Sequence, residues 1–317
     1  MPAQPLSRNL TGMLVLALGI MLFSVQDAII KAVSSDYALT EAIVIRSLVA
    51  LPILVAMVQA EAGLTRLARG NIGGMIARGL ILLVSYTSYY MAIAALPLAE
   101  AIALFFVSPV MVTLLAGPIL GERVSLKSWL AVGIGFVGVL IILQPGSAVF
   151  KPAALLSLVS AAAYGLAMVL ARKMGASAPA SVMSFHQNGV YLLGALVIAG
   201  VCGALGLTRL DNPALDFLLR PWATPTLRDF LMMAACGVIA AVAMALLTQA
   251  YRLAEANLVT VFEYSGMIWA PLWGFLFFAE VPRWTTFAGM ALIVAAGLYS
   301  ARAAAGQAPK VVAVLEA

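Results

Sequence analysis

The sequence predicts an all-α integral membrane protein, with ten transmembrane helices arranged as two inverted five-helix repeats. Hydrophobic residues make up 64% of the 317 residues and charged residues only 10%, and the mean hydropathy is +1.07. Apolar segments of about 20 residues, the length that crosses a bilayer as a helix, follow one another with short polar connections. The alternation typical of membrane β-strands is absent, so helices remain the way to pair every backbone group inside the bilayer.

The predicted spans divide into two groups of five. The first apolar segment, Leu10 to Ile30, is longer than the apolar region of a secretory signal and is kept as a span. Residues 1–9 and 305–317 are expected to be tails, residues 10–143 the first repeat, and residues 152–304 the second repeat with a polar loop near residues 205–225. The spans are expected at about residues 10–33, 39–60, 72–94, 98–119, 126–143, 152–173, 180–203, 226–251, 256–278 and 284–304.

The repeat can be followed along the chain by a constant offset. At an offset of 141, the first repeat matches the second at Leu14 and Leu155, Phe23 and Tyr164, Lys31 and Arg172, Thr40 and Ser181, and Arg46 and Gln187. After the seventh span the offset becomes 158, and the matches are Gly79 and Gly237, Ala92 and Ala250, Leu114 and Leu272, Glu122 and Glu280, and Trp129 and Phe287. An odd number of spans in each copy inverts the second relative to the first, which is the usual plan of secondary transporters.

Basic residues predict the orientation of the spans. Eleven of the eighteen Lys and Arg residues fall on the side that carries both termini, and the six on the other side are Lys31, Lys151, Arg209, Arg220, Arg228 and Arg283. Positive loops are retained in the cytoplasm, so both termini are predicted to be cytoplasmic. The net charge of +5 reflects this loop bias, and no nucleic-acid partner is expected. Cys202 and Cys236 show no ligand spacing, so neither a disulfide framework nor a metal site is predicted.

Proline and glycine interrupt the fourth and ninth spans, which are equivalent in the two repeats. Pro109 and Pro118 lie in the fourth span and Pro271 in the ninth. Proline removes a backbone hydrogen bond and kinks a helix, and the freed carbonyl groups can face a cavity. Paired interrupted spans therefore point to a binding site, and we take these three prolines as hinges. The alternative is that the prolines only shape helix packing.

Ionisable groups inside spans are costly in hydrocarbon and usually face protein or water. Glu263 shares a helical face with Asn257, Tyr264 and Met267 in the ninth span. A carboxylate there could hold a substrate ammonium group or carry a proton. The alternative is a permanent ion pair between Glu263 and a neighbouring arginine.

The third span carries a tyrosine cluster. Tyr86 and Tyr90 lie one helical turn apart, with Tyr89 beside them. Phenol rings offer a flat apolar surface with a hydrogen-bonding tip, so Tyr86 and Tyr90 are predicted to contact substrate. The alternative is an aromatic belt at the membrane interface. For Tyr89 the belt and the cavity are equally favoured.

Three further polar residues lie inside spans. His186, the only histidine, could relay protons because its pKa is ordinarily near neutrality, but a hydrogen bond that joins two helices is the favoured role. Asp27 is a second relay candidate. Arg46 is predicted to form a structural ion pair with Asp27 or Glu41, and a clamp on a ligand is the less favoured alternative.

The remaining patterns argue for packing and against catalysis. Gly133, Gly135 and Gly138 in the fifth span would let another helix approach closely. No nucleotide-binding loop and no convergent acid, base and nucleophile set is present in the sequence, so no cofactor and no enzymatic activity are predicted. An intramembrane enzyme or a packing scaffold is the minor alternative.

One motif carries a family resemblance. Pro109 stands thirteen residues before Glu122, in a proline, apolar run, Gly-Glu-Arg ending, and the second half repeats the glutamate as Ala279 and Glu280 with Met267 in place of the proline. With ten spans in two halves, this pattern resembles the drug/metabolite transporter superfamily, specifically its EamA-type exporters, over about residues 10 to 304. Within it, the chain looks similar to bacterial YddG-type exporters of aromatic amino acids.

The resemblance implies a function. It implies a central cavity opened alternately to each side of the bacterial inner membrane, with export of amino acids and related small metabolites by a monomer or weak homodimer. Glu122 and Glu280 would cap the loops that follow their spans. Broad efflux of drugs or toxic compounds is the alternative, since a cavity with methionine and aromatic residues adapts to many ligands.

Overall fold

The computed structural model describes residues 6–121, 126–147, 150–174, 179–207, 209–253 and 264–305, and within these ranges every regular element is a helix. The helices are α1 (Leu6–Val33), α2 (Leu39–Glu61), η1 (Leu64–Ala68), α3 (Ile72–Ala95), α4 (Leu98–Phe105), α5 (Ser108–Leu120), α6 (Leu126–Leu143), α7 (Ala154–Met174), α8 (Ala180–Ala204), α9 (Pro213–Leu219), α10 (Leu227–Leu253), α12 (Gly266–Phe278) and α13 (Trp284–Ala305). The all-helical prediction is thus confirmed for the described part of the chain.

Seven candidate spans in the described residues are long and apolar enough to cross a membrane. One of them, Leu98–Leu120, combines α4 and α5. Three shorter apolar helices, Trp129–Leu143, Gly266–Phe278 and Trp284–Tyr299, lie where the fifth, ninth and tenth spans were predicted. Large apolar side chains cover the outside of the bundle, including Phe136 on α6, Val197 on α8 and Phe275 on α12, which are about half to two thirds exposed. Such a surface suits contact with lipid.

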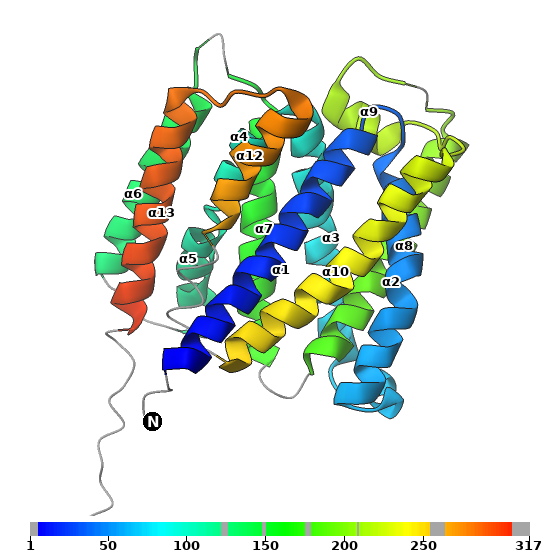
Figure 1. Cartoon of the computed structure of the whole chain (residues 1–317), viewed down its shortest axis with the longest axis horizontal. Helices are drawn as coiled ribbons and strands as arrows, with labels where there is room; N and C mark the ends of the chain where they lie inside the picture. The colour runs from blue at the N-terminus through cyan, green and yellow to red at the C-terminus, as the bar shows by residue number, and fades with distance from the viewer. Residues whose placement is uncertain are drawn as a thin grey trace, which may run out of the picture.

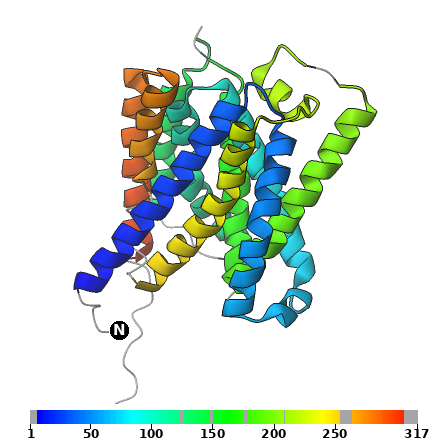
Figure 2. The ribbon, with the colours of Figure 1, turned by 45° about the vertical axis from the view of Figure 1, so that its right-hand side comes forward.

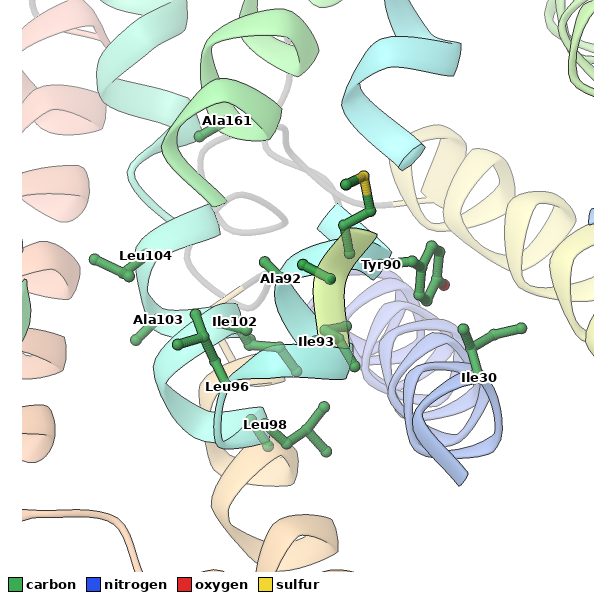
Figure 3. Close-up of a cluster of buried hydrophobic side chains, with 14 of the residues drawn as sticks. Ile30, Tyr90, Ala92, Ile93, Leu96, Leu98, Ile102, Ala103, Leu104 and Ala161 are labelled. Atoms are coloured by element: carbon green, nitrogen blue, oxygen red, sulfur yellow. The ribbon is translucent and has the colours of Figure 1, made fainter. Parts of the chain in front are cut away.

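The long helices run side by side between two ends of one bundle (Figures 1 and 2). We call the end that carries α9 the α9 end, and the end where α1 begins the N-terminal end. Helix α1 packs on α10, α2 on α8, α3 on α7, and α6 on α13. Between the helices lies a core of buried apolar residues, part of which joins α1, α3, α4 and α7 through Ile30, Ile93, Leu104 and Ala161 (Figure 3).

The fourth span is broken near its middle. Helix α4 ends at Phe105 and α5 begins at Ser108, so Phe106 and Val107 separate two shorter helices. Pro109 occupies the first turn of α5, where the missing N–H leaves no hydrogen bond unmade. Pro118 and Pro271 lie inside α5 and α12.

The polar insertion between α8 and α10 docks on the start of α2. The indole of Trp222 donates to Thr40 Oγ1 at 2.8 Å, and the backbone N–H of Ala223 donates to Glu41 Oε2 at 3.2 Å. Arg220 pairs with Asp216 of α9, and its Nη1 donates to the carbonyl oxygen of Ser35. Phe217 of α9 is fully buried. The insertion therefore covers the α9 end of α1 and α2.

Glycines bring α6 and α13 into close contact. A Cβ atom built on Gly138 would lie 2.9 Å from the carbonyl oxygen of Gly289 on α13, and one built on Gly135 would lie 3.1 Å from Val110 of α5. The predicted close approach is confirmed at these two positions. Gly133 differs, since nothing lies within 4 Å of its Cβ position.

We expect Gly138→Ala to destabilise the protein by about 1–3 kcal/mol, the usual cost of forcing a methyl group into a packed contact. Gly133→Ala is the matched control on the same helix, and it should be neutral or slightly stabilising because alanine favours helix more than glycine does. Thermal unfolding of the two variants in the same detergent measures the difference. Equal midpoints would contradict the tight α6–α13 contact.

Candidate functional site

Arg46 is the centre of a polar cluster inside the bundle. It lies two turns into α2, and 8% of its surface is exposed. Its guanidinium carbon stands 4.9 Å from the ring centroid of Tyr86 and 5.9 Å from that of Tyr191, which come from α3 and α8. Cation–π contact stabilises such a charge by about 2 kcal/mol when it is desolvated, so the two rings offset part of its burial cost.

The predicted ion pair of Arg46 with Asp27 or Glu41 is wrong. Asp27 accepts hydrogen bonds from Tyr89 and Tyr90 at 2.8 and 2.9 Å, and Glu41 accepts from the backbone of Ala223. The Nε and Nη1 atoms of Arg46 are buried without a hydrogen-bond partner among the described residues. An uncompensated buried charge ordinarily costs roughly 3–5 kcal/mol, so this arrangement is unusual for a purely structural residue.

Asp27 organises the neighbouring tyrosines. Besides its bonds from Tyr89 and Tyr90, the Tyr90 hydroxyl accepts a bond from Gln26 Nε2 at 2.9 Å. Tyr90 is almost wholly buried, and its ring lies 4.4 Å from that of Tyr86. The Tyr86 hydroxyl is buried without a partner in the described part of the chain. Tyr89 points its hydroxyl into the bundle toward α1, which is not the orientation of an interfacial belt.

A small cavity adjoins Arg46. Its volume is about 40 Å³, enough for a small polar group of roughly two or three water-sized atoms. It is lined from α2, α8 and α10 by Arg46, Ala50, Leu54, Ser184, Gln187, Asn188, Tyr191, Ala240, Ala241 and Met244. Asn188 donates to the carbonyl oxygen of Ser47, and Gln187 donates to the Tyr191 hydroxyl. Polar groups of α8 therefore face Arg46 across the space.

The other predicted site residues are dispersed. Tyr264 is buried, with its ring 5.7 Å from that of Phe106 and its hydroxyl against Gly297 of α13. Met267 is buried near the start of α12. Asn257 and Glu263 lie outside the described residues.

Within the described residues, His186 makes no hydrogen bond to another helix, the role that we favoured from the sequence. Its Nδ1 donates to the carbonyl oxygen of Val182 at 2.9 Å, one turn back in the same helix α8. Arg78 lies buried in α3. It donates to the Ala167 carbonyl and, at 3.4 Å, to Gln187 Oε1.

Two ion pairs hold the α9 end together. Lys31 of α1 meets Glu280 Oε1 at 2.8 Å, and Arg283 meets Glu100 of α4 at 2.7 Å. The Glu280 Oε2 atom accepts from the Leu98 backbone N–H, and Lys31 also donates to the carbonyl oxygens of Ile93 and Leu96. Glu280 thus caps the start of α4 rather than the loop that follows its own span. The sequence analysis did not predict these two ion pairs. The position of all four charged residues close to the ends of predicted spans was a signal that could have indicated them.

The chain is similar to known membrane transporters. A model of the EamA-like transporter family matches residues 10–144 and residues 151–301. A pseudopaline exporter of Pseudomonas aeruginosa is 29% identical over 300 residues, which are 93% of this chain and 98% of that protein. A riboflavin transporter of Rhizobium johnstonii is 33% identical over 211 residues, 66% of this chain and 64% of that protein.

Two further similarities are more distant. An S-adenosylmethionine uptake transporter of Rickettsia bellii is 24% identical over 224 residues, 71% of this chain and 70% of that protein. A solved crystal structure superposes with a TM-score of 0.60 at 17% identity, covering 95% of this chain and 98% of the other. That superposition supports the fold alone.

Proposed function

We propose that the protein is a secondary transporter of amino acids and related small metabolites. The chain belongs to the EamA-like transporter family, so it is a membrane transporter and not an enzyme. It would move aromatic or apolar amino acids by alternating access. The observation that carries the proposal is the polar cluster of Arg46, Tyr86 and Tyr191 beside a cavity inside an otherwise apolar bundle. Intramembrane ionisable groups ordinarily mark substrate pathways.

We further propose ten transmembrane helices in two inverted repeats. Support comes from the family model, which matches twice, and from the helix pairings. Helices α1 and α7 are equivalent in the repeat, as are α3 and α10, and α1 packs on α10 while α7 packs on α3. The helix pairs α2–α8 and α6–α13 each join equivalent helices. A two-fold axis relating the halves would produce these pairings.

The proposed orientation is that of a bacterial inner-membrane exporter with both termini cytoplasmic. In that orientation the α9 end faces outward, and its ion pairs close the outer entrance. Export is favoured by the pseudopaline exporter, which aligns along 98% of its length. Pro109, Pro118 and Pro271 would be hinges, and the break between α4 and α5 beside Pro109 supports that role for the first of them. The transporter would act as a monomer or weak homodimer.

The substrate contacts are proposed to come from Tyr86, Tyr90, Asn257, Glu263, Tyr264 and Met267. Tyrosine rings would stack on an apolar side chain, and Glu263 with Asn257 would meet the ammonium group. Asp27, Glu263 and His186 are the proposed polar or proton relay. The tyrosine contacts around Asp27 support a shared network between this residue and the proposed substrate rings.

Counterflow in proteoliposomes tests the proposal. Vesicles are loaded with one unlabelled amino acid at a time and diluted into trace labelled phenylalanine. We expect accumulation that depends on the internal amino acid and is greatest for aromatic ones. The absence of accumulation with every amino acid, from folded protein, would contradict amino-acid transport.

Broad efflux of drugs is the second candidate function. A continuous aromatic row supports it, because the rings of Tyr89, Phe105 and Tyr164 lie about 5 Å apart and would accept many flat ligands. The same vesicles loaded with lipophilic cations distinguish the two candidates. Counterflow driven by cations and by no amino acid would favour drug efflux.

We expect Glu263→Gln to lower amino-acid counterflow by about tenfold or more, because a glutamine cannot neutralise a buried ammonium group. Size-exclusion profiles and expression should be unchanged. Glu61→Gln, at the C-terminus of α2, is the control at the membrane edge and should retain transport. Undiminished counterflow in Glu263→Gln at every pH would remove Glu263 from the proposed site.

A further inference from the structure

Two N–H donor atoms of Arg46 have no acceptor in the part of the chain that the structure describes. Its Nε and Nη1 atoms are buried and make no hydrogen bond within the described residues. The aromatic rings of Tyr86 and Tyr191 lie against the guanidinium group and stabilise its charge. They do not act as acceptors for the N–H groups that point outward in the plane of the guanidinium. A buried guanidinium that is stacked, yet unpaired within the described residues, can bind an acceptor supplied by a ligand.

Two polar side chains that line the cavity beside Arg46 are already engaged, and a third group nearby can donate. The Tyr86 hydroxyl is buried without a partner in the described chain. The Tyr191 hydroxyl donates to the Leu82 carbonyl, and the amide nitrogen of Asn188 donates to the Ser47 carbonyl. The missing chemical group is therefore an acceptor with a negative charge. A carboxylate fits this description, because it accepts several hydrogen bonds and donates none.

Four carboxylates of the described residues near these helices are committed elsewhere. Asp27 accepts from Tyr89 and Tyr90, and Glu41 accepts from the insertion at Ala223. Glu280 and Glu100 are held in ion pairs at the α9 end. None of these four supplies the acceptor that Arg46 lacks.

The cavity gives the acceptor a place. Arg46, Ala50 and Leu54 line one face of α2 at spacings of four, so the cavity extends from the guanidinium toward the N-terminal end. Its opposite wall includes Gln187 of α8, the repeat equivalent of Arg46. The two equivalent positions thus face the same space, as expected on the axis that relates two inverted repeats, where transporters place their substrate. The volume of about 40 Å³ admits a carboxylate-sized group in this conformation.

We propose that Arg46, with the Tyr86 hydroxyl, binds the carboxylate of the transported substrate, so that the substrate class is restricted to molecules that carry a carboxylate. This assignment rests on the proposed transport function. It gives the substrate a fixed polarity, with the carboxylate at Arg46 and the apolar side chain against the tyrosine rings of α3. Planar guanidinium groups hold carboxylates more firmly than an ammonium group does, because two parallel N–H donors match the two oxygens.

The test compares phenylalanine with phenylalaninamide as the internal compound in counterflow of labelled phenylalanine. The amide keeps the ring and the amino group and lacks only the carboxylate. For the wild-type protein we expect the amide to drive counterflow at least roughly tenfold less, the factor produced by losing a hydrogen bond to a charged group. Equal drive by the two compounds would overturn the proposal.

Arg46→Met removes the charge and keeps most of the side-chain volume. We expect it to lose the preference for phenylalanine over phenylalaninamide, with the rate for phenylalanine falling roughly tenfold or more. Arg46→Lys should retain a weaker preference, and it replaces the Met variant if that variant does not fold. Arg78→Gln is the matched control, a buried arginine of α3 whose Nε and Nη1 atoms already have acceptors, and it should keep the preference. Retention of the full preference by Arg46→Met would also overturn the proposal.

Two further arms separate the possible failures. Replacing chloride by methanesulfonate should leave the preference unchanged, whereas counterflow that requires chloride and ignores the substrate carboxylate would assign Arg46 to an inorganic anion. If no compound drives counterflow, the proposed transport function is contradicted. The carboxylate assignment is then tested separately, by measuring ligand binding. Phenylalanine, but not phenylalaninamide, should then raise the unfolding temperature of the wild-type protein and not that of Arg46→Met. No such difference would overturn the assignment.

Discussion

Replacing Glu280 by glutamine is expected to open the α9 end of the bundle. The side chains of Lys31 and Glu280 are only 11% and 20% exposed, and their charged atoms are 2.8 Å apart. The substitution removes the charge but leaves an oxygen that can still accept from the Leu98 N–H. A pair at this depth is worth about 2 kcal/mol, between the exposed and buried limits, so the open population should rise roughly 30-fold.

Cys236 is a natural reporter for this opening. It is a free thiol on α10 with none of its surface exposed, and Cys202 can be replaced by serine to leave it as the reporter. We expect a membrane-impermeant maleimide, added at the α9 side, to label Cys236 faster in Glu280→Gln than in the parent. Glu100→Gln is the comparison, and its effect should be smaller because its partner Arg283 is 34% exposed. An unchanged labelling rate in Glu280→Gln would contradict a gate at this pair.

Replacing Gly237 by alanine is expected to cause a large loss of stability. A Cβ at Gly237 of α10 would lie 2.4 Å from the carbonyl oxygen of Arg46 and 2.9 Å from Cβ of Val49, both on α2. The backbone of α2 cannot move aside as a flexible side chain can, so an added methyl group would force α10 and α2 apart. We expect a cost of about 3 kcal/mol or failure to fold. Because the contact is with Arg46 itself, transport by any folded fraction should fall as well.

Gly200→Ala on α8 provides the control for Gly237→Ala. Nothing lies within 4 Å of its Cβ position, so a methyl group there meets open space. Alanine should leave the unfolding temperature equal or slightly higher, since it favours helix over glycine. Fluorescence-detected size exclusion and thermal unfolding of both variants give the comparison. A Gly237→Ala protein as stable as Gly200→Ala would contradict the close crossing of α2 and α10.

The sequence predicted the helices well because span length and hydropathy are local properties. The break between α4 and α5 follows from the sequence too, since Pro109 suits the first turn of a helix. The close contact of α6 with another helix could be predicted from Gly135 and Gly138, because small residues in membrane helices allow neighbouring backbones to approach closely.

The partners of charged residues were not predictable in the same way. Asp27 and Arg46 lie on helices that follow one another in the chain, but which side chain each one faces depends on the rotation of α1, α2 and α3 about their axes. The structure turns Asp27 toward Tyr89 and Tyr90 and leaves Arg46 between Tyr86 and Tyr191. Hydropathy carries no information about such rotations.

The pair of Lys31 with Glu280 shows the limit set by chain separation. The two residues lie at opposite ends of the sequence, and only the packing of α1 beside α12 brings them together. Sequence reasoning recognised Glu280 as a capping residue, which is right in kind, since its Oε2 accepts from the first N–H of α4. The helix that it caps could only be learned from the tertiary structure.

Distance measurements between spin labels at the two ends test alternating access most directly. In a protein without native cysteines, one pair joins Ala32 to Val281 at the α9 end, and a second pair joins Leu64 to Leu126 at the N-terminal end. All four positions are exposed. Added phenylalanine is predicted to lengthen the first distance and shorten the second in the same fraction of molecules. Distances that stay fixed, or that change in the same direction at both ends, would contradict a carrier that opens its two ends in turn.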